Sequence, residues 1–408
     1  MRGSSKMQPK SRGRVAVITL FTTAISLAIG PSVARAAGVD GTPDADFAAA
    51  FSQPFNSEVN AVAVQSDGSI VVGGDFSGTV ARFGAAGVPD ISFNALAGGV
   101  TGGARITSLS VGQSGEIVAA GWFTGLYRFS SAGAPDPAFA AASISALGGE
   151  TGAVVVQPDG QILVVGSFAG ILARLNPDGT ADAAFNANVA ATLDARAYSV
   201  ALQSDGKILV AGEFTGHLKR FLASGAPDTT FNNNVGDAGG TVSIVRVATD
   251  GSVVIVGEFG DRLARYHSDG TADTGFNAHV HAVGIEEVGM YALAIQRDGK
   301  VVIGGDTTTH LARFNADGTA DTAFNSTVGS YFDNRVWAIT VDASDNLLVG
   351  GNFTSRVARL SSSYAPASYA PDLPATGVST DGLIWIALTM LAAGAALVAA
   401  QRRTHRVR

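Results

Sequence analysis

A seven-bladed β-propeller, closed into a ring by an N-terminal strand, is the all-β fold that this sequence predicts. The first observation behind the prediction is a motif that recurs seven times. Each copy has an alternating apolar segment, a polar tight turn, a segment rich in Val and Ile that ends in Gly-x-Phe, and an apolar-x-Arg-apolar segment. Successive copies are 45 to 48 residues apart. A period this regular indicates a repeat architecture and not a set of ordinary domains.

The second observation is the phase of the repeats. The seventh copy stops at Leu360 without its last element, and an orphan copy of that element, Asp40 to Phe47, precedes the first repeat. The two ends therefore complete one blade, as expected for a ring in which the first and last blades hold each other. An open solenoid would instead need polar capping repeats.

Each repeat predicts four short antiparallel strands. In one copy they cover residues 200–203, 207–214 and 217–221 and a short piece around 228–231. Asp-Gly pairs favour tight hairpin turns between them, because glycine adopts positive φ angles without strain. Four strands in about 46 residues is the size of a propeller blade. The first turn has a glycine in six copies and an asparagine in the seventh, namely Gly68, Gly115, Gly160, Gly206, Gly251, Gly299 and Asn346.

The repeated elements VQxDGKI, GxF and DGxxDxxFN resemble the delta-60 β-propeller repeat, which is named for a family of exported bacterial proteins of mostly unknown activity. The resemblance covers nearly all of residues 40–360, and we expect the propeller domain to span 37–360. Two copies depart from the pattern: Gln113-Ser114-Gly115 lacks the turn aspartate, and Gly305-Asp306-Thr307 lacks the phenylalanine.

Residues 1–36 predict a signal peptide. An apolar stretch over 15–29 follows five basic residues, and Ala34 and Ala36 are the small residues that a signal peptidase needs, so we expect cleavage between Ala36 and Ala37. An uncleaved membrane anchor is the alternative. The basic residues are Arg2, Lys6, Lys10, Arg12 and Arg14.

The C-terminal segment 373–408 resembles the cell-wall sorting signal of Gram-positive surface proteins, in which a sortase cuts an LPxTG motif and joins the new carboxyl end to peptidoglycan. An apolar run over 383–400 and four terminal arginines follow the motif. As a helix the run would be about 27 Å long, enough to cross a membrane with its basic end inside. A simple tail anchor is the alternative. The motif residues are Leu373, Pro374, Ala375, Thr376 and Gly377.

This resemblance implies sortase as a partner, covalent attachment to peptidoglycan through Thr376, and a membrane-bound precursor. The linker 361–372, rich in Ser, Ala, Pro and Tyr, reaches about 37 Å when fully extended. The propeller should therefore remain close to its attachment point in the cell wall.

Composition excludes several classes of function. Residues 37–376 contain 17 Lys and Arg against 33 Asp and Glu, a net charge of −16. This balance argues against a nucleic-acid partner, whose phosphates need a basic surface. The chain has no cysteine, so disulfides, thiol catalysis and cysteine zinc sites are excluded.

Two charged positions recur in every repeat and are therefore expected to be structural. We predict that each arginine bridges to the aspartate of the following turn, since a guanidinium can hold a carboxylate with two hydrogen bonds. A sevenfold anion site is the alternative. The arginines are Arg82, Arg128, Arg174, Arg220, Arg265, Arg313 and Arg359, and the aspartates are Asp44, Asp90, Asp136, Asp182, Asp228, Asp273 and Asp321.

The middle residue of Gly-x-Phe varies between copies and lies beside the irregular connections, where binding usually resides. Its four carboxylates could hold a cation, calcium being suited to oxygen ligands, or a sugar. Alternatively they are solvated strand ends. We call these positions the rim; they are Asp75, Trp122, Ser167, Glu213, Glu258, Asp306 and Asn352. His279 and His281 alternate on one face of a predicted strand, but two histidines are weak evidence for zinc.

The chain has no recognisable catalytic motif, such as Gly-x-Ser-x-Gly, His-Glu-x-x-His or a Walker loop. The function that the sequence favours is a sortase-anchored surface propeller that binds a ligand, a glycan or a protein, as an adhesin or wall-associated module. The alternative is a surface hydrolase or lyase acting on glycans.

Overall fold

The computed structural model describes residues 40–51, 55–98, 103–285 and 289–363. The chain divides into units 1–36 and 37–408, and every described residue belongs to the second. The predicted signal peptide, sorting motif and apolar segment 383–400 lie outside the described residues. In the part of the chain that is described, no helix is both long and apolar enough to cross a membrane.

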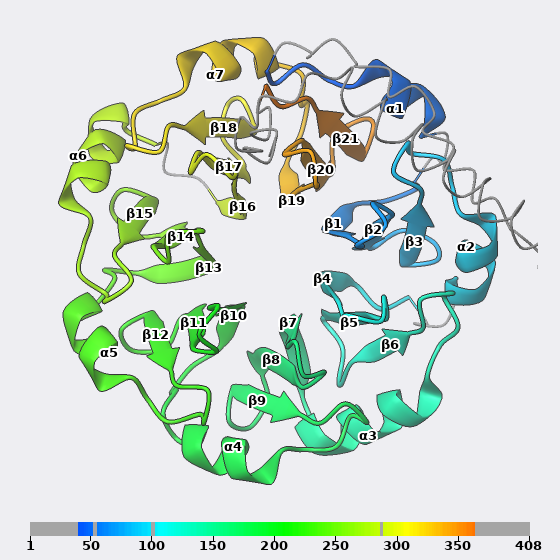
Figure 1. Cartoon of the computed structure of the whole chain (residues 1–408), viewed down its shortest axis with the longest axis vertical. Coiled ribbons are helices and arrows are strands. Elements are labelled where there is room, and N and C mark those ends of the chain that lie inside the picture. The colour runs from blue at the N-terminus through cyan, green and yellow to red at the C-terminus, as the bar shows by residue number, and fades with distance from the viewer. Residues whose placement is uncertain (1–39, 52–54, 99–102, 286–288, 364–408) are drawn as a thin grey trace, which may run out of the picture. The chain divides into compact units, whose positions relative to one another are not determined.

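The described residues form seven antiparallel sheets of three strands each, in chain order. In Figure 1 the first strand of each sheet lies nearest the centre. The strands are β1 Val59–Val64, β2 Ile70–Gly74 and β3 Val80–Phe83; β4 Ile106–Val111, β5 Ile117–Gly121 and β6 Tyr127–Phe129; β7 Glu150–Val156, β8 Ile162–Ser167 and β9 Leu172–Leu175; β10 Ala197–Leu202, β11 Ile208–Gly212 and β12 Leu218–Phe221; β13 Thr241–Val247, β14 Val253–Glu258 and β15 Leu263–Tyr266; β16 Met290–Ile295, β17 Val301–Gly305 and β18 Leu311–Phe314; β19 Val336–Val341, β20 Leu347–Gly351 and β21 Val357–Leu360.

The predicted fourth strand of each blade is wrong, because a short helix takes its place at the outer edge (Figure 1). The piece around 228–231 begins helix α5: the Asp228 side chain accepts a hydrogen bond from the Phe231 backbone amide, as an N-cap does. Phe231 and Val235, one helical turn apart, are buried. In this blade the pairing expected of a fourth strand is reduced to a single isolated β-bridge, between Phe221 and Pro227. The helices are α1 Ala45–Ala50, α2 Ile91–Ala97, α3 Pro137–Leu147, α4 Ala183–Val189, α5 Thr229–Val235, α6 Thr274–Val283 and α7 Thr322–Val328.

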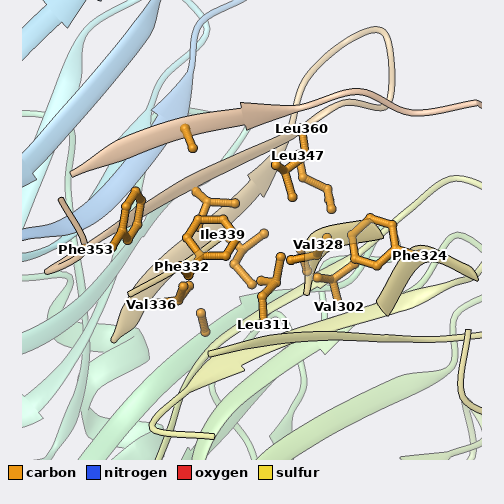
Figure 2. Close-up of a cluster of buried hydrophobic side chains, with 14 residues drawn as sticks. Val302, Leu311, Phe324, Val328, Phe332, Val336, Ile339, Leu347, Phe353 and Leu360 are labelled. Atoms are coloured by element: carbon orange, nitrogen blue, oxygen red, sulfur yellow. The ribbon is translucent and has the colours of Figure 1, made fainter. Parts of the chain in front are cut away.

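Hydrophobic cores lie between consecutive blades. Figure 2 shows the core between the sixth and seventh blades, where Phe324 of α7 and Leu311 of β18 meet Ile339 of β19 and Leu347 of β20. The middle strands of these two blades, β17 and β20, are buried along their whole length, as expected for strands covered on both faces. Burial of these faces between neighbours explains why a single blade would not be stable alone.

The first and last blades share one core and several hydrogen bonds. Phe47 of α1 packs with Val357 of β21 and Leu348 of β20. The Gly41 amide donates to the Ser361 carbonyl at 2.9 Å, and Pro43 bridges Leu360. The expectation of an N-terminal strand is wrong, since this segment contributes one bridge and helix α1.

The first turn of the seventh blade differs from the expected alignment. Asp345, with a φ of 65°, takes the position that glycine has in the other turns, and Asn346 is the residue after it. Aspartate tolerates this left-handed conformation better than most residues, although at some cost. Asp345 is fully buried, and its carboxylate accepts a hydrogen bond from the Arg297 amide of the preceding blade.

Candidate binding face

A β-bulge interrupts the first strand of every blade at the same position. In β19, Val336 pairs with Gly351 and Ala338 with Gly350, so Trp337 has no partner in β20. Bulges often redirect a side chain next to a functional site. We call the seven residues at this position the bulge residues; they are Asn60, Thr107, Gly152, Tyr198, Ser243, Tyr291 and Trp337.

The rim residues lie at the same end of the blades as the bulges. The Trp122 amide donates to the Arg105 carbonyl at 3.1 Å, and the Asn352 amide donates to the Arg335 carbonyl at 2.9 Å. Arg105 and Arg335 directly precede the first strands of their blades. We call this end, made of the rim, the bulge residues and the residues that precede the first strands, the bulge face. The Asp-Gly turns occupy the opposite end.

Most rim residues are exposed, but several already have partners. Arg335 forms an ion pair with Asp306, and the Tyr198 hydroxyl donates a hydrogen bond to Glu213. Among the described residues, no three of the His, Asp and Glu side chains are grouped so that they could hold a metal ion. The hypothesis of calcium at the rim therefore gains no support.

The predicted strand containing His279 and His281 is wrong, because both residues lie in helix α6. His281 contacts the Asp261 carboxylate through Nδ1 at 2.7 Å, and His279 contacts the Asp317 carbonyl at 2.8 Å. The Asp261 carboxylate raises the pKa of His281. The two histidines thus have separate contacts and do not form a joint site.

Charged and aromatic side chains from three blades meet on the bulge face. The Arg105 guanidinium carbon lies 4.6 Å from the Trp122 ring centroid and 5.8 Å from that of Trp337. Arg105 also forms an ion pair with Glu58 at 3.1 Å. Cation–π contacts of this kind contribute about 0.5–1 kcal/mol at exposed sites. We call Glu58, Arg105, Trp122 and Trp337 the Arg–Trp cluster.

Two tyrosines among the bulge residues also lie on this face, and one of them contacts Trp337. The rings of Tyr291 and Trp337 have centroids 4.3 Å apart, and the Tyr291 hydroxyl lies 3.4 Å from an Asp306 carboxylate oxygen. Burial, followed by the Glu213 carboxylate, raises the pKa of Tyr198 to about 12, and burial with Asp306 raises the pKa of Tyr291. Both phenols therefore stay protonated at neutral pH and can donate hydrogen bonds.

Several buried polar atoms on the bulge face have no hydrogen-bond partner among the described residues. They are Asn60 Nδ2 and Oδ1, Arg105 Nε, Arg196 Nε and Trp337 Nε1. Each unsatisfied buried group costs about 1–3 kcal/mol of folding free energy.

The repeated arginines form a different, structural set. Each one pairs with the aspartate of the following turn, with nitrogen–oxygen distances of 2.5 to 2.9 Å, except that Arg359, at the end of the last blade, pairs with Asp44 at 2.6 Å. The guanidinium also lies over a phenylalanine of the adjacent helix, as Arg220 does over Phe231 at 4.0 Å. In addition, Arg174 reaches the Ala223 carbonyl of the next blade at 3.0 Å.

Two grooves lie at the turn end of the blades and use this structural set. The larger, of about 530 Å³, is lined by Arg128, Asp136 and Glu116, and the smaller, of about 280 Å³, by Asp250, Arg265 and Asp298. Their charged groups are those of the repeated turns. The rim and bulge residues, which vary between the blades, are instead on the bulge face.

The sequence predicted the rim but not the bulge residues. The signal was present: in six of the seven aligned copies a polar or aromatic residue directly follows the first apolar residue of the repeat, and the third copy has Gly152 there. The bulge inserts one extra residue into the strand and so shifts which side chains point to which face. A prediction based on strict alternation therefore assigns these side chains to the wrong face.

Six segments of the chain match the family model described as a domain of unknown function, DUF5122, β-propeller; they are residues 65–93, 113–139, 157–185, 203–231, 248–276 and 296–324. No curated protein matches the sequence significantly.

Among solved structures, the chain is similar to one titled "Streptogramin B lyase structure", at 12% identity and a TM-score of 0.49, over 76% of this chain and 94% of that one. It is also similar to the WD40 β-propeller domain of Doa1, at 13% identity and a TM-score of 0.53, over 76% of this chain and 95% of that one. Identities this low concern the fold alone. The family model and the seven three-stranded sheets agree that the chain is a seven-bladed β-propeller.

Proposed function

We propose that this protein is a surface-attached β-propeller that binds a ligand through its bulge face. The observation that carries the proposal is Trp122, whose ring is 56% exposed and lies 4.6 Å from the guanidinium carbon of Arg105. Exposed aromatic rings and a few convergent polar groups are typical of binding sites. The turn end, by contrast, repeats the same ion pair in every blade.

The N-terminal and C-terminal segments support attachment to the cell wall. The proposed order is export by the signal peptide, retention by the apolar segment 383–400, and transfer of Thr376 to peptidoglycan by a sortase. The motif Leu373 to Gly377, the apolar run and the basic end occur in the order that this process requires. The contacts of Gly41, Pro43 and Phe47 with the last blade further support a propeller closed into a ring.

Binding is favoured over the alternative of a glycan hydrolase or lyase. Most glycosidases need two carboxylates at a defined separation, one of them kept protonated. On the bulge face, Glu58 and Asp306 pair with Arg105 and Arg335, and Glu213 accepts from Tyr198. These three carboxylates are therefore already engaged by side chains of the bulge face.

The test is retention of the purified full chain on isolated Gram-positive cell walls. Replacing Trp122 by Ala should reduce the retained fraction at least tenfold. The control is Ile91→Ala, because Ile91 is 79% exposed and begins α2 at the outer edge. Equal retention of both variants and the unaltered protein would show that the bulge face is not the binding surface.

A further inference from the structure

One position at the turn end of the blades is occupied differently in the fifth blade. Four blades begin their first turn with a buried glutamine; these residues are Gln65, Gln157, Gln203 and Gln296. The fifth blade has Ala248 there, whose carbonyl accepts from the Gly251 amide as the Gln296 carbonyl accepts from the Gly299 amide. The smaller groove, of about 280 Å³, is lined by Ala248. The fifth blade therefore has an open space where four other blades carry a side-chain carboxamide.

In the first and sixth blades this glutamine connects two neighbouring blades. Gln296 Oε1 accepts a hydrogen bond from Arg313 Nη1 at 2.9 Å, and Gln296 Nε2 donates to the Asp345 carbonyl of the next blade at 3.0 Å. Gln65 makes the two equivalent bonds in the first blade, at 3.3 and 2.8 Å. The chain thus shows how one primary carboxamide fits between the repeated arginine of a blade and the first turn of the next blade.

The smaller groove has the same two partners without the carboxamide. Arg265, the counterpart of Arg313, lines it, and its side chain is 17% exposed. Gly299, the counterpart of Asp345, also lines it. Arg265 Nη1 has one acceptor among the described residues, the Ala316 carbonyl at 2.7 Å, whereas Arg313 Nη1 has two. The Gly299 carbonyl accepts no hydrogen bond from the described residues. A donor and an acceptor therefore face a space in which a ligand can meet both.

The charges that line the groove favour a neutral ligand. Arg265 and Arg297 are matched in number by Asp250 and Asp298, and Arg265 is also paired with Asp273 at 2.7 Å. A carboxylate would be repelled by the aspartates, and an ammonium group by the arginines. A neutral group that both accepts and donates avoids both penalties.

The larger groove lacks this arrangement. It lies in the second blade, which has Gly112 in place of the glutamine, and it is lined by Arg128. Gly160, the counterpart of Gly299 in the next blade, is not among its lining residues. Since the acceptor is missing there, the larger groove provides an internal comparison for the smaller one.

We infer that the smaller groove binds a glutamine side chain of a partner peptide, in the place that the chain's own glutamine takes in the first and sixth blades. The ligand's side-chain oxygen accepts from Arg265 Nη1, and its amide nitrogen donates to the Gly299 carbonyl. This site is separate from the bulge face, because it lies at the opposite end of the blades.

Saturation-transfer NMR on the purified full chain tests the ligand class. The probe is N-acetylglutamine methylamide, whose only primary amide is that of the side chain. The matched probes are the same derivatives of methionine, which has a similar length and no side-chain amide, and of glutamate, which at neutral pH accepts hydrogen bonds but cannot donate them. Saturation should be transferred to the glutamine probe and at least tenfold less to the other two. No transfer to the glutamine probe, or equal transfer to either matched probe, would overturn the inference.

Ala248→Gln tests the location, because it places a carboxamide of the chain in the groove. Transfer to the glutamine probe should be lost, and the melting temperature should rise as the two bonds seen for Gln296 form. Ala248→Met fills the same space without hydrogen bonds, so it should also lose the transfer but melt at a lower temperature than Ala248→Gln. Transfer that persists in both variants, or a melting temperature no higher for glutamine than for methionine, would overturn the inference.

Glu116→Gln is the matched control, since it introduces a carboxamide into the larger groove. It should leave the transfer to the glutamine probe unchanged. Loss of the transfer in this variant as well would show that the probe does not bind at the fifth blade, and the inference would fail.

Discussion

Arg359 in the last strand of the propeller forms an ion pair with Asp44, 315 residues earlier, at 2.6 Å. The same arginine contacts the Ala85 carbonyl of the first blade at 2.6 Å. Asp44 is 3% exposed and is the N-cap of α1, whose amides at Asp46 and Phe47 donate to it. One arginine thus connects the start of the described chain, its end and the first blade.

Deleting residues 40–47 should therefore destabilise the whole propeller. The deletion removes the fully buried Phe47 and leaves Arg359 without its carboxylate. Loss of the phenylalanine alone is worth about 3–5 kcal/mol. The measurement is thermal unfolding, with Ile91→Ala as a variant that removes an exposed apolar side chain. A truncated protein that melts at the original temperature would contradict closure by this segment.

Replacing a structural arginine should lower the free energy of unfolding more when its side chain is more deeply buried. The side chain of Arg313 is 2% exposed and that of Arg128 24% exposed, although both pair with the aspartate of their own turn. Arg313→Met should cost about 3–5 kcal/mol, because Asp321 and Asp40 are left without a buried cation. Arg128→Met should cost about 1 kcal/mol. Denaturant unfolding measures both, and equal losses would contradict this dependence on burial.

Asp345→Asn should stabilise the protein at neutral pH and not in acid. Burial raises the pKa of Asp345, so the folded state binds a proton more tightly than the unfolded state. Its contribution to stability is full below the unfolded pKa of about 3.9 and is lost as the pH rises through the folded pKa. Asparagine tolerates positive φ and still accepts from the Arg297 amide. We expect a gain of about 1 kcal/mol at pH 7 that disappears near pH 3.

Asp67→Asn is the control for that pH dependence, because its sign is opposite. The Ser69 backbone amide, donating to the exposed Asp67 carboxylate, lowers the pKa of Asp67. Its contribution is present above the unfolded pKa and lost as the pH falls through the folded pKa. The control should therefore gain nothing at pH 7. Melting curves of both variants between pH 3 and 8 that run parallel would contradict the assignment.

Changing Leu373 or Pro374 to Ala should leave the protein in the membrane fraction, since a sortase would no longer cut its motif. Cell fractionation after muramidase digestion distinguishes wall-linked from membrane-held protein. Ser379→Ala, outside the motif, is the control and should leave wall attachment unchanged. Covalent wall attachment that survives the Leu373 and Pro374 changes would exclude sortase anchoring.

By itself the sequence determined the repeat, and through it the fold. The turn glycines, the apolar strands and the arginine and aspartate of each copy are set by interactions within about 46 residues or with the next copy, so their pattern is visible in the chain. The helices were missed because Asp-x-x-Phe-Asn was interpreted as a turn and strand. Its aspartate is in fact an N-cap, and its phenylalanine lies one helical turn from a second buried residue.

Only the tertiary structure decided the content of the bulge face. Glu58, Arg105 and Trp337 come from three different blades, and their contacts depend on how the blades are placed side by side. The bulge at Asn60 and Trp337 is a local departure from strand alternation, and the sequence shows a sign of it only when the seven copies are aligned with one another. The same holds for Asp345, whose burial follows from its packing against the preceding blade and not from its own turn.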